Sequence, residues 1–143
     1  MKNIRSIFLL LMLLTVLRSE AQPYIGRHAG DVKQYIRTHQ REFSLDQTTR
    51  NTAYRYLKFV DQMGYKTLLV FLSDQDTCSW YKIVYDADLY DSIVESLDTC
   101  CKRESDTSWI EVIGDEHYRK VLKKTDWFFS VTTRPAGESG GRK

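Results

Sequence analysis

The stretch YKTLLVFLSDQDTCSWYKIVY, residues 65–85, has the pattern of two strands joined by a turn, and it decides the fold. Its first arm places Leu68 and Val70 on one face of an extended chain and Leu69 and Phe71 on the other. A strand that is apolar on both faces needs cover on both, which is typical of the interior of a sheet. The polar segment SDQDT suits a turn, and the aromatic and β-branched residues after it suit a returning strand.

Amphipathic helices are predicted on both sides of this hairpin. In residues 29–41, apolar side chains recur at helical spacing and include Val32 and Ile36. Residues 88–103 carry a second stripe of this kind, and Asp88 is placed to cap its first turn. Both segments therefore predict helices with one apolar face.

The remaining short apolar runs favour strands. Residues 118–123 also permit a helix, but they are few for one, and their neighbours have strand patterns. The polar segments 44–51 and 104–107 are predicted to be connectors. We expect an α+β fold of two α-β-β-β units that form one six-stranded antiparallel sheet with two helices packed on one face. The expected strands are residues 52–60, 66–73, 78–85, 108–113, 118–123 and 127–133.

The N-terminus has the three parts of a secretory signal peptide. Basic residues precede an apolar run at residues 7–17, which is short for a membrane span, and Ser19-Glu20-Ala21 ends the segment. We expect cleavage after Ala21 and a secreted or periplasmic protein, while a retained N-terminal anchor is the alternative. Residues 22–133 then form one domain, and residues 134–143 are predicted to be a disordered tail.

Removal of the signal peptide changes the charge of the protein. Lys2, Arg5, Arg18 and Glu20 leave with it, so the 21 basic and 19 acidic residues of the whole chain become equal in number. A neutral mature chain gives no support for a nucleic-acid partner, which needs a basic surface.

The chain has three cysteines, and in an oxidising compartment one disulfide is expected. Cys78 is predicted to pair with either Cys100 or Cys101, which would tie the hairpin to the second helix and leave one free thiol. The alternative is a redox or metal role, but the sequence has no CxxC motif and no His at ligand spacing. No metal and no cofactor are therefore expected.

The pattern best supports a non-enzymatic binding module, with a protein as the expected partner. Two helices on one face of a sheet leave the other face uncovered, and Tyr and Trp side chains suit a contact surface there. Each of these rings could instead belong to the core or to a cross-strand pair. The candidate contact residues are Tyr54, Tyr56, Trp80, Tyr81, Trp109 and Trp127.

Two other functions are alternatives, namely a small extracytoplasmic hydrolase and an immunity or inhibitor protein. Acidic residues occur at Asp74 and Asp76, at Asp86 and Asp88, and in the segment 115–117, but such residues in turns and helix caps have a routine structural use. The chain lacks a Gly-rich phosphate loop, and the loop of Asp74 and Asp76 lacks the ligand spacing of a calcium site. No catalytic residue is predicted.

The order of elements resembles a known architecture. The entry Tyr24-Ile25-Gly26 and the motifs LKFV at 57–60, KTLLVFLSDQDTC at 66–78 and DWFFSVTT at 126–133 are similar to those of small secreted bacterial proteins. The order α-β-β-β-α-β-β-β of this chain resembles the tandem helix-and-meander units of the beta-lactamase-inhibitor-protein-like architecture, in which the sheet presents one face to a protein partner. This chain departs from it by having three expected strands per unit instead of four, so the resemblance implies the architecture and not the inhibitory activity.

Overall fold

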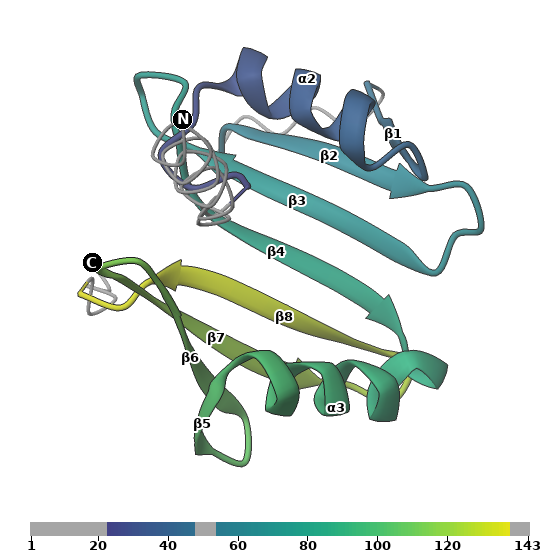
Figure 1. Ribbon diagram of the computed structural model, residues 1–143. Helices are drawn as coiled ribbons and strands as arrows, with labels where there is room; N and C mark the ends of the chain where they lie inside the picture. Colours follow the sequence, from purple (N-terminus) through teal and green to yellow (C-terminus); the bar gives the residue numbers. More distant parts are fainter. Residues whose placement is uncertain (1–22, 48–53, 138–143) are drawn as a thin grey trace, which may run out of the picture.

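The computed structural model describes residues 23–47 and 54–137, which form an α+β protein with one antiparallel sheet of eight strands (Figure 1). The strands lie in the order β1-β2-β3-β4-β8-β7-β6-β5, so β4 and β8 meet in the middle. The elements are α2 (Ala29–His39), β1 (Phe43–Leu45), β2 (Tyr56–Asp61), β3 (Lys66–Leu72), β4 (Cys78–Asp86), the 3₁₀ helix η1 (Ala87–Leu89), α3 (Tyr90–Cys100), β5 (Lys102–Ser105), β6 (Ser108–Ile113), β7 (Glu116–Lys124) and β8 (Phe128–Pro135).

Two hydrophobic clusters lie on the same face of this sheet. Directly opposed residues of antiparallel strands share a face, and the register pairs Ile83 with Val131 and Tyr85 with Phe129 across the central strands. Ile83 packs against the cluster under α2, whereas Val131 belongs to the cluster under α3. The two helices therefore cover one face, on the near side of the sheet in Figure 1.

The two clusters form the core of the protein. α2 inserts Val32 and Ile36, and α3 inserts Leu97. The cluster under α2 consists of Tyr24, Val32, Ile36, Phe59, Leu68, Val70, Cys78 and Tyr81. The cluster under α3 consists of Leu97, Trp109, Leu122, Phe129 and Val131.

The predicted hairpin is confirmed as β3 and β4, and both strands lie inside the sheet. The turn before β3 contains Gly64 at φ +77°, a backbone conformation that glycine adopts without strain. β7 is a strand, as expected, and not a helix.

The sheet has eight strands, so the expectation of six was wrong. The two missed strands are β1 and β5, which lie at the opposite edges of the sheet and are short. All four side chains of β5 are exposed, so its sequence carries no apolar pattern. Short, charged edge strands of this kind resist pairing with other chains. Each helix is therefore followed by four strands along the chain.

The ends of two elements also differ from expectation. Asp86, and not Asp88, provides the cap before the second helix, because its carboxylate accepts a hydrogen bond of 3.0 Å from the Asp88 amide. α3 ends at Cys100, and the chain then turns into β5. β8 continues to Pro135, so Arg134 belongs to the sheet and not to a tail.

The predicted bridge from Cys78 is not formed. All three cysteines are free thiols. Cys78 is buried in the cluster under α2, whereas Cys101 packs against the cluster under α3. The physical reason is that α3 lies over the second set of strands and not over the hairpin that carries Cys78.

The predicted signal peptide, residues 1–21, lies outside the described residues, as do the first residues of the strand expected at 52–60. Among the helices in the described part of the chain, none has both the length and the apolar character needed to cross a bilayer.

Candidate functional site

The face of the sheet opposite the helices, which we call the open face, carries a continuous row of aromatic rings. Tyr56, Phe71 and Trp80 stand directly opposite one another on β2, β3 and β4. The rings of Tyr56 and Phe71 have centroids 5.6 Å apart, and those of Phe71 and Trp80 are stacked at 3.7 Å. The Arg134 guanidinium lies 4.6 Å from the Trp80 ring centroid and ends the row on β8. We call these four residues the aromatic row.

Positive charge predominates on the open face around this row. Strand register assigns side chains to the face, because residues alternate between the two sides of a sheet. The acidic residues of the face are Asp46, which pairs with Lys58 at 2.9 Å, Asp86, which caps η1, and Glu104, which pairs with Arg119 at 3.2 Å. The basic residues are Lys58, Lys82, Lys102, Arg119, Lys123 and Arg134. A chain with nearly balanced charge thus carries a basic surface.

The structure divides the predicted contact residues into three groups. Tyr56 and Trp80 belong to the aromatic row. Tyr81 and Trp109 are 5% and 0% exposed and lie in the core on the helix side, so they have no surface to offer a partner. Tyr54 and Trp127 are exposed but lie outside the row, before β2 and before β8.

Two members of the aromatic row were missed from the sequence. The sequence predicts cover on both faces of the strand that carries Phe71, and it places Arg134 in a disordered tail. Phe71 could have been identified from its position opposite Tyr56 and Trp80, but this position follows only from the strand register.

Asp76, Asp86 and Glu116, among the acidic residues considered for catalysis, have carboxylates with structural partners. The Arg55 guanidinium binds the Asp76 carboxylate and donates a hydrogen bond of 3.1 Å to the Asp74 carbonyl. The Glu116 carboxylate accepts a hydrogen bond from the Tyr118 hydroxyl. Burial and this carboxylate raise the pKa of Tyr118 to about 12. These contacts hold turns and strand ends in place.

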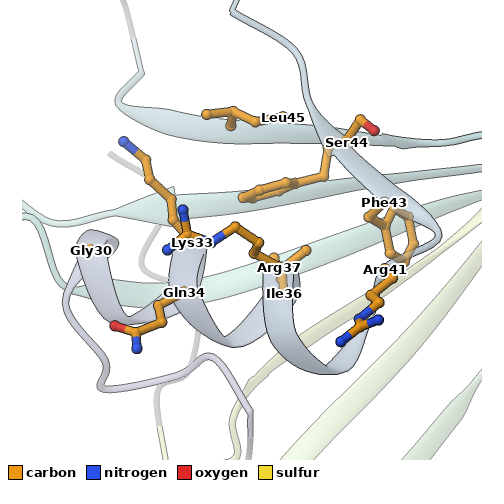
Figure 2. Close-up of a pocket in the computed structure, with 10 residues that line it drawn as sticks. Gly30, Lys33, Gln34, Ile36, Arg37, Arg41, Phe43, Ser44 and Leu45 are labelled. Carbon is orange, nitrogen blue, oxygen red and sulfur yellow. The ribbon is translucent and has the colours of Figure 1, made fainter.

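A shallow pocket of about 500 Å³ lies between α2 and β1 (Figure 2). Ile36 and Phe59 belong to its lining and to the core. Lys33, Arg37 and Arg41 supply its charged groups. Its lining contains no acidic side chain and comprises Gly30, Lys33, Gln34, Ile36, Arg37, Arg41, Phe43, Ser44, Leu45 and Phe59. The pocket can attract an anion, but it contains no arrangement of nucleophile and base.

Three groups that can bind a metal ion lie together at the end of α3. The Cys100 and Cys101 sulfurs and a Glu111 carboxylate oxygen are all within 4.8 Å of one another. We call these three residues the thiol cluster. It lies on the helix side of the sheet, because Glu111 stands opposite the buried Tyr118 in the β6–β7 pair.

The described residues thus contain a basic aromatic surface, a shallow cationic pocket and a thiol cluster. Of these, the open face is the largest feature and extends over all the strands. Comparison of the chain with protein-family models, with curated proteins and with solved structures finds no match.

Proposed function

We propose that this protein is a secreted or periplasmic, non-enzymatic binding module that holds an acidic protein surface against its open face. The observation that carries the proposal is the aromatic row of Tyr56, Phe71, Trp80 and Arg134, with basic side chains around it. An antiparallel sheet that leaves such a row partly exposed on an uncovered face has a surface suited to a partner.

The rings of the row are already ordered before a partner arrives. Stacking at 3.7 Å between Phe71 and Trp80, and the guanidinium of Arg134 over the indole, restrict these side chains in the free protein. Less side-chain entropy is therefore lost on binding, which favours affinity. Trp, Tyr and Arg are also the residue types that most often dominate the energy of protein interfaces.

The charges of the open face determine the kind of partner. Lys82 lies two residues from Trp80 on the same face of β4, and Arg134 ends the row on β8. Basic groups of this density steer an acidic surface toward the face and repel a basic one. We therefore propose a partner whose contact surface is rich in Asp and Glu.

We also propose that the chain consists of two similar units, each a helix followed by strands, that join through β4 and β8. The support is the symmetric strand order, in which the last strand after each helix lies at the centre and the first lies at an edge. The open face then extends across both units, so a partner would hold the two together.

The test is a charge reversal on the open face. The mature protein captures its partner from the native medium or periplasm, and the purified partner is then titrated against the wild type and the Lys82→Glu/Arg134→Glu variant. We expect the variant to bind about tenfold or more weakly and the wild-type affinity to fall with added salt.

The matched control is Lys33→Glu/Arg37→Glu, which makes the same charge change on exposed residues of α2, on the other side of the sheet. This control should bind as the wild type does. Equal losses in both variants would contradict the open face as the contact surface. Binding of a single-stranded oligonucleotide with the same sensitivity to Lys82→Glu/Arg134→Glu would instead assign the face to nucleic acid.

A further inference from the structure

The thiol cluster is built where three elements meet. The Cys101 amide donates a hydrogen bond of 3.0 Å to the Leu97 carbonyl and closes the last turn of α3. The chain then becomes extended at Cys101, with φ −134° and ψ 156°, and this thiol packs against the cluster under α3. The Cys100 thiol stays exposed, and the two sulfurs are 2.9 Å apart.

β6 and β7 supply the two charged side chains of the site, Glu111 and Lys120. Glu111 lies two residues beyond the buried Trp109 and therefore on the same face of β6. Lys120 stands opposite Trp109 on β7, and its ammonium nitrogen lies 3.1 Å from a Glu111 carboxylate oxygen. Both side chains of this pair are mostly buried, with exposed fractions of 13% for Lys120 and 18% for Glu111.

We propose that Cys100, Cys101 and Glu111 bind one thiophilic divalent cation, of the class of Zn²⁺ or Cd²⁺, with Lys120 as a charged neighbour of the site. Two thiolates are soft ligands that select zinc-like ions over Ca²⁺ and Mg²⁺. Three protein ligands leave one position of a tetrahedral ion open, and the exposed Cys100 places that position toward solvent.

The charges at the site balance when such an ion is bound. Two thiolates and one carboxylate carry three negative charges, and a divalent ion together with the Lys120 ammonium carries three positive charges. A carboxylate has two oxygens with several lone pairs, so Glu111 can accept from Lys120 and still ligate the ion. Lys120 would orient Glu111 as outer-sphere groups orient ligands in other metal sites.

This site is independent of the proposed binding face, because it lies on the helix side of the sheet. Bound metal would join the end of α3 to β6. Cys78 takes no part, since it is buried in the other cluster. It therefore offers a cysteine control within the same chain.

The test uses the full mature chain, reduced and then freed of reductant, titrated with Cd²⁺ and separately with Zn²⁺. We expect one ion per chain by native mass spectrometry, a thiolate-to-cadmium charge-transfer absorption, and a rise in melting temperature with Zn²⁺. Cys100→Ser and Cys101→Ser should each abolish the absorption or shift it to that of a single thiolate. Cys100→Ser is the decisive variant, because Cys100 is exposed and we expect its replacement to leave the fold intact.

Two further variants separate this site from adventitious binding. Lys120→Met should weaken Zn²⁺ affinity about 10–100-fold, as loss of an outer-sphere partner does. Cys78→Ser should bind both ions as the wild type does. The proposal is overturned if Cys100→Ser keeps wild-type affinity, if Cys78→Ser loses it, or if protein isolated without reductant contains a Cys100–Cys101 disulfide.

Discussion

The first half of the described chain, α2 with β1 to β4, and the second half, α3 with β5 to β8, have the same order of elements. Their helices pack on the same face of the sheet, yet the two helices are held by different contacts. In the first half, α2 inserts Val32 and Ile36, which are 0% and 1% exposed. In the second half, α3 inserts Leu97 alone as a buried residue, and Leu97 is 7% exposed. The second helix thus buries fewer apolar residues completely, while Tyr90, Ile93 and Val94 pack against its cluster as partly buried residues.

Hydrogen bonds to a charged side chain also hold the second helix in place. The Asp98 carboxylate on α3 accepts two hydrogen bonds from Arg103, of 2.8 and 2.7 Å, and one of 2.7 Å from the Trp109 indole N–H. Trp109 is fully buried beneath the helix, so this bond links the helix surface to the core. We call the contacts among Asp98, Arg103 and Trp109 the polar clamp. A helix at the same place in the order of elements can thus be held by buried apolar side chains alone or by apolar packing together with a polar clamp.

In the first half, backbone hydrogen bonds add to the apolar contacts of α2, and we call these hydrogen bonds the backbone tie. The segment before α2 pairs with the start of β4: the Gly26 amide donates to the Cys78 carbonyl, and the Cys78 amide donates to the Arg27 carbonyl, both at 2.8 Å. The Ala29 amide donates to the Asp76 carbonyl at the same distance. α3 instead follows β4 directly through η1.

The largest expected effect on stability comes from replacing Trp109, the buried residue of the polar clamp. Trp109→Ala should lower the free energy of unfolding by about 3–5 kcal/mol, because it removes a fully buried ring and leaves a cavity. Urea denaturation measures the change. Trp127→Ala is the matched control, because Trp127 is 84% exposed, and its effect should stay within about 0.5 kcal/mol. Equal effects at the two positions would contradict the assigned core.

The next effect compares the two helices directly. Ile36→Ala should cost about 2–5 kcal/mol, and Leu97→Ala should fall at the lower end of that range, because Leu97 retains some exposure. Both values come from the same denaturation experiment. A larger loss at Leu97 than at Ile36 would show that the second half relies on apolar burial as much as the first does.

A smaller effect on stability, which depends on pH, comes from replacing Asp98, an exposed residue of the polar clamp. Hydrogen bonds from Arg103 and Trp109 hold the pKa of Asp98 below its usual value of 3.8. A carboxyl group with a lowered folded-state pKa contributes stability above its unfolded pKa and loses it as the pH falls through the folded pKa. Asp98→Asn should therefore be less stable than wild type at neutral pH, and this difference should disappear in acid.

Unfolding curves at several pH values measure this difference. A constant difference between wild type and Asp98→Asn down to strongly acidic pH would show that the carboxylate charge does not contribute to the clamp.

The smallest expected effect is on the rate at which a reagent labels the Cys78 thiol, and it tests the backbone tie of the first half. Burial raises the pKa of Cys78 to about 12, and its side chain is 2% exposed. In a Cys100→Ser/Cys101→Ser variant, a thiol reagent should modify Cys78 only as fast as the first half opens, whereas wild type should show an early phase from Cys100. Rapid labelling of Cys78 would mean that its segment opens without unfolding.

The inner strands and both helices could be predicted from the sequence because burial imposes a period on their residues. The apolar alternation of β3 and the stripe of Val32 and Ile36 are direct consequences of packing. β5 could not be predicted, since this edge strand is stabilised by backbone pairing and its side chains are polar. β1 could not be predicted because three residues are too few to show a period, although Phe43 and Leu45 pack against the core.

The contact surface was predictable only in part, for a geometric reason. Trp80 and Tyr81 are neighbours in sequence and project to opposite faces, so a shift of one residue exchanges surface and core. Composition alone cannot choose between them. The register with Phe71 and Thr133 makes the choice, and it depends on strands distant in sequence.

The central pairing of β4 with β8 has a consequence for how the chain is completed. During synthesis, β4 remains an unpaired edge until β8, the last strand of the described chain, is available to cover it. A chain cut short before Phe128 would therefore expose the edges of both β4 and β7, two long strands of the kind that nucleate aggregation. Damage near the C-terminus should thus be more harmful than its position in the sequence suggests.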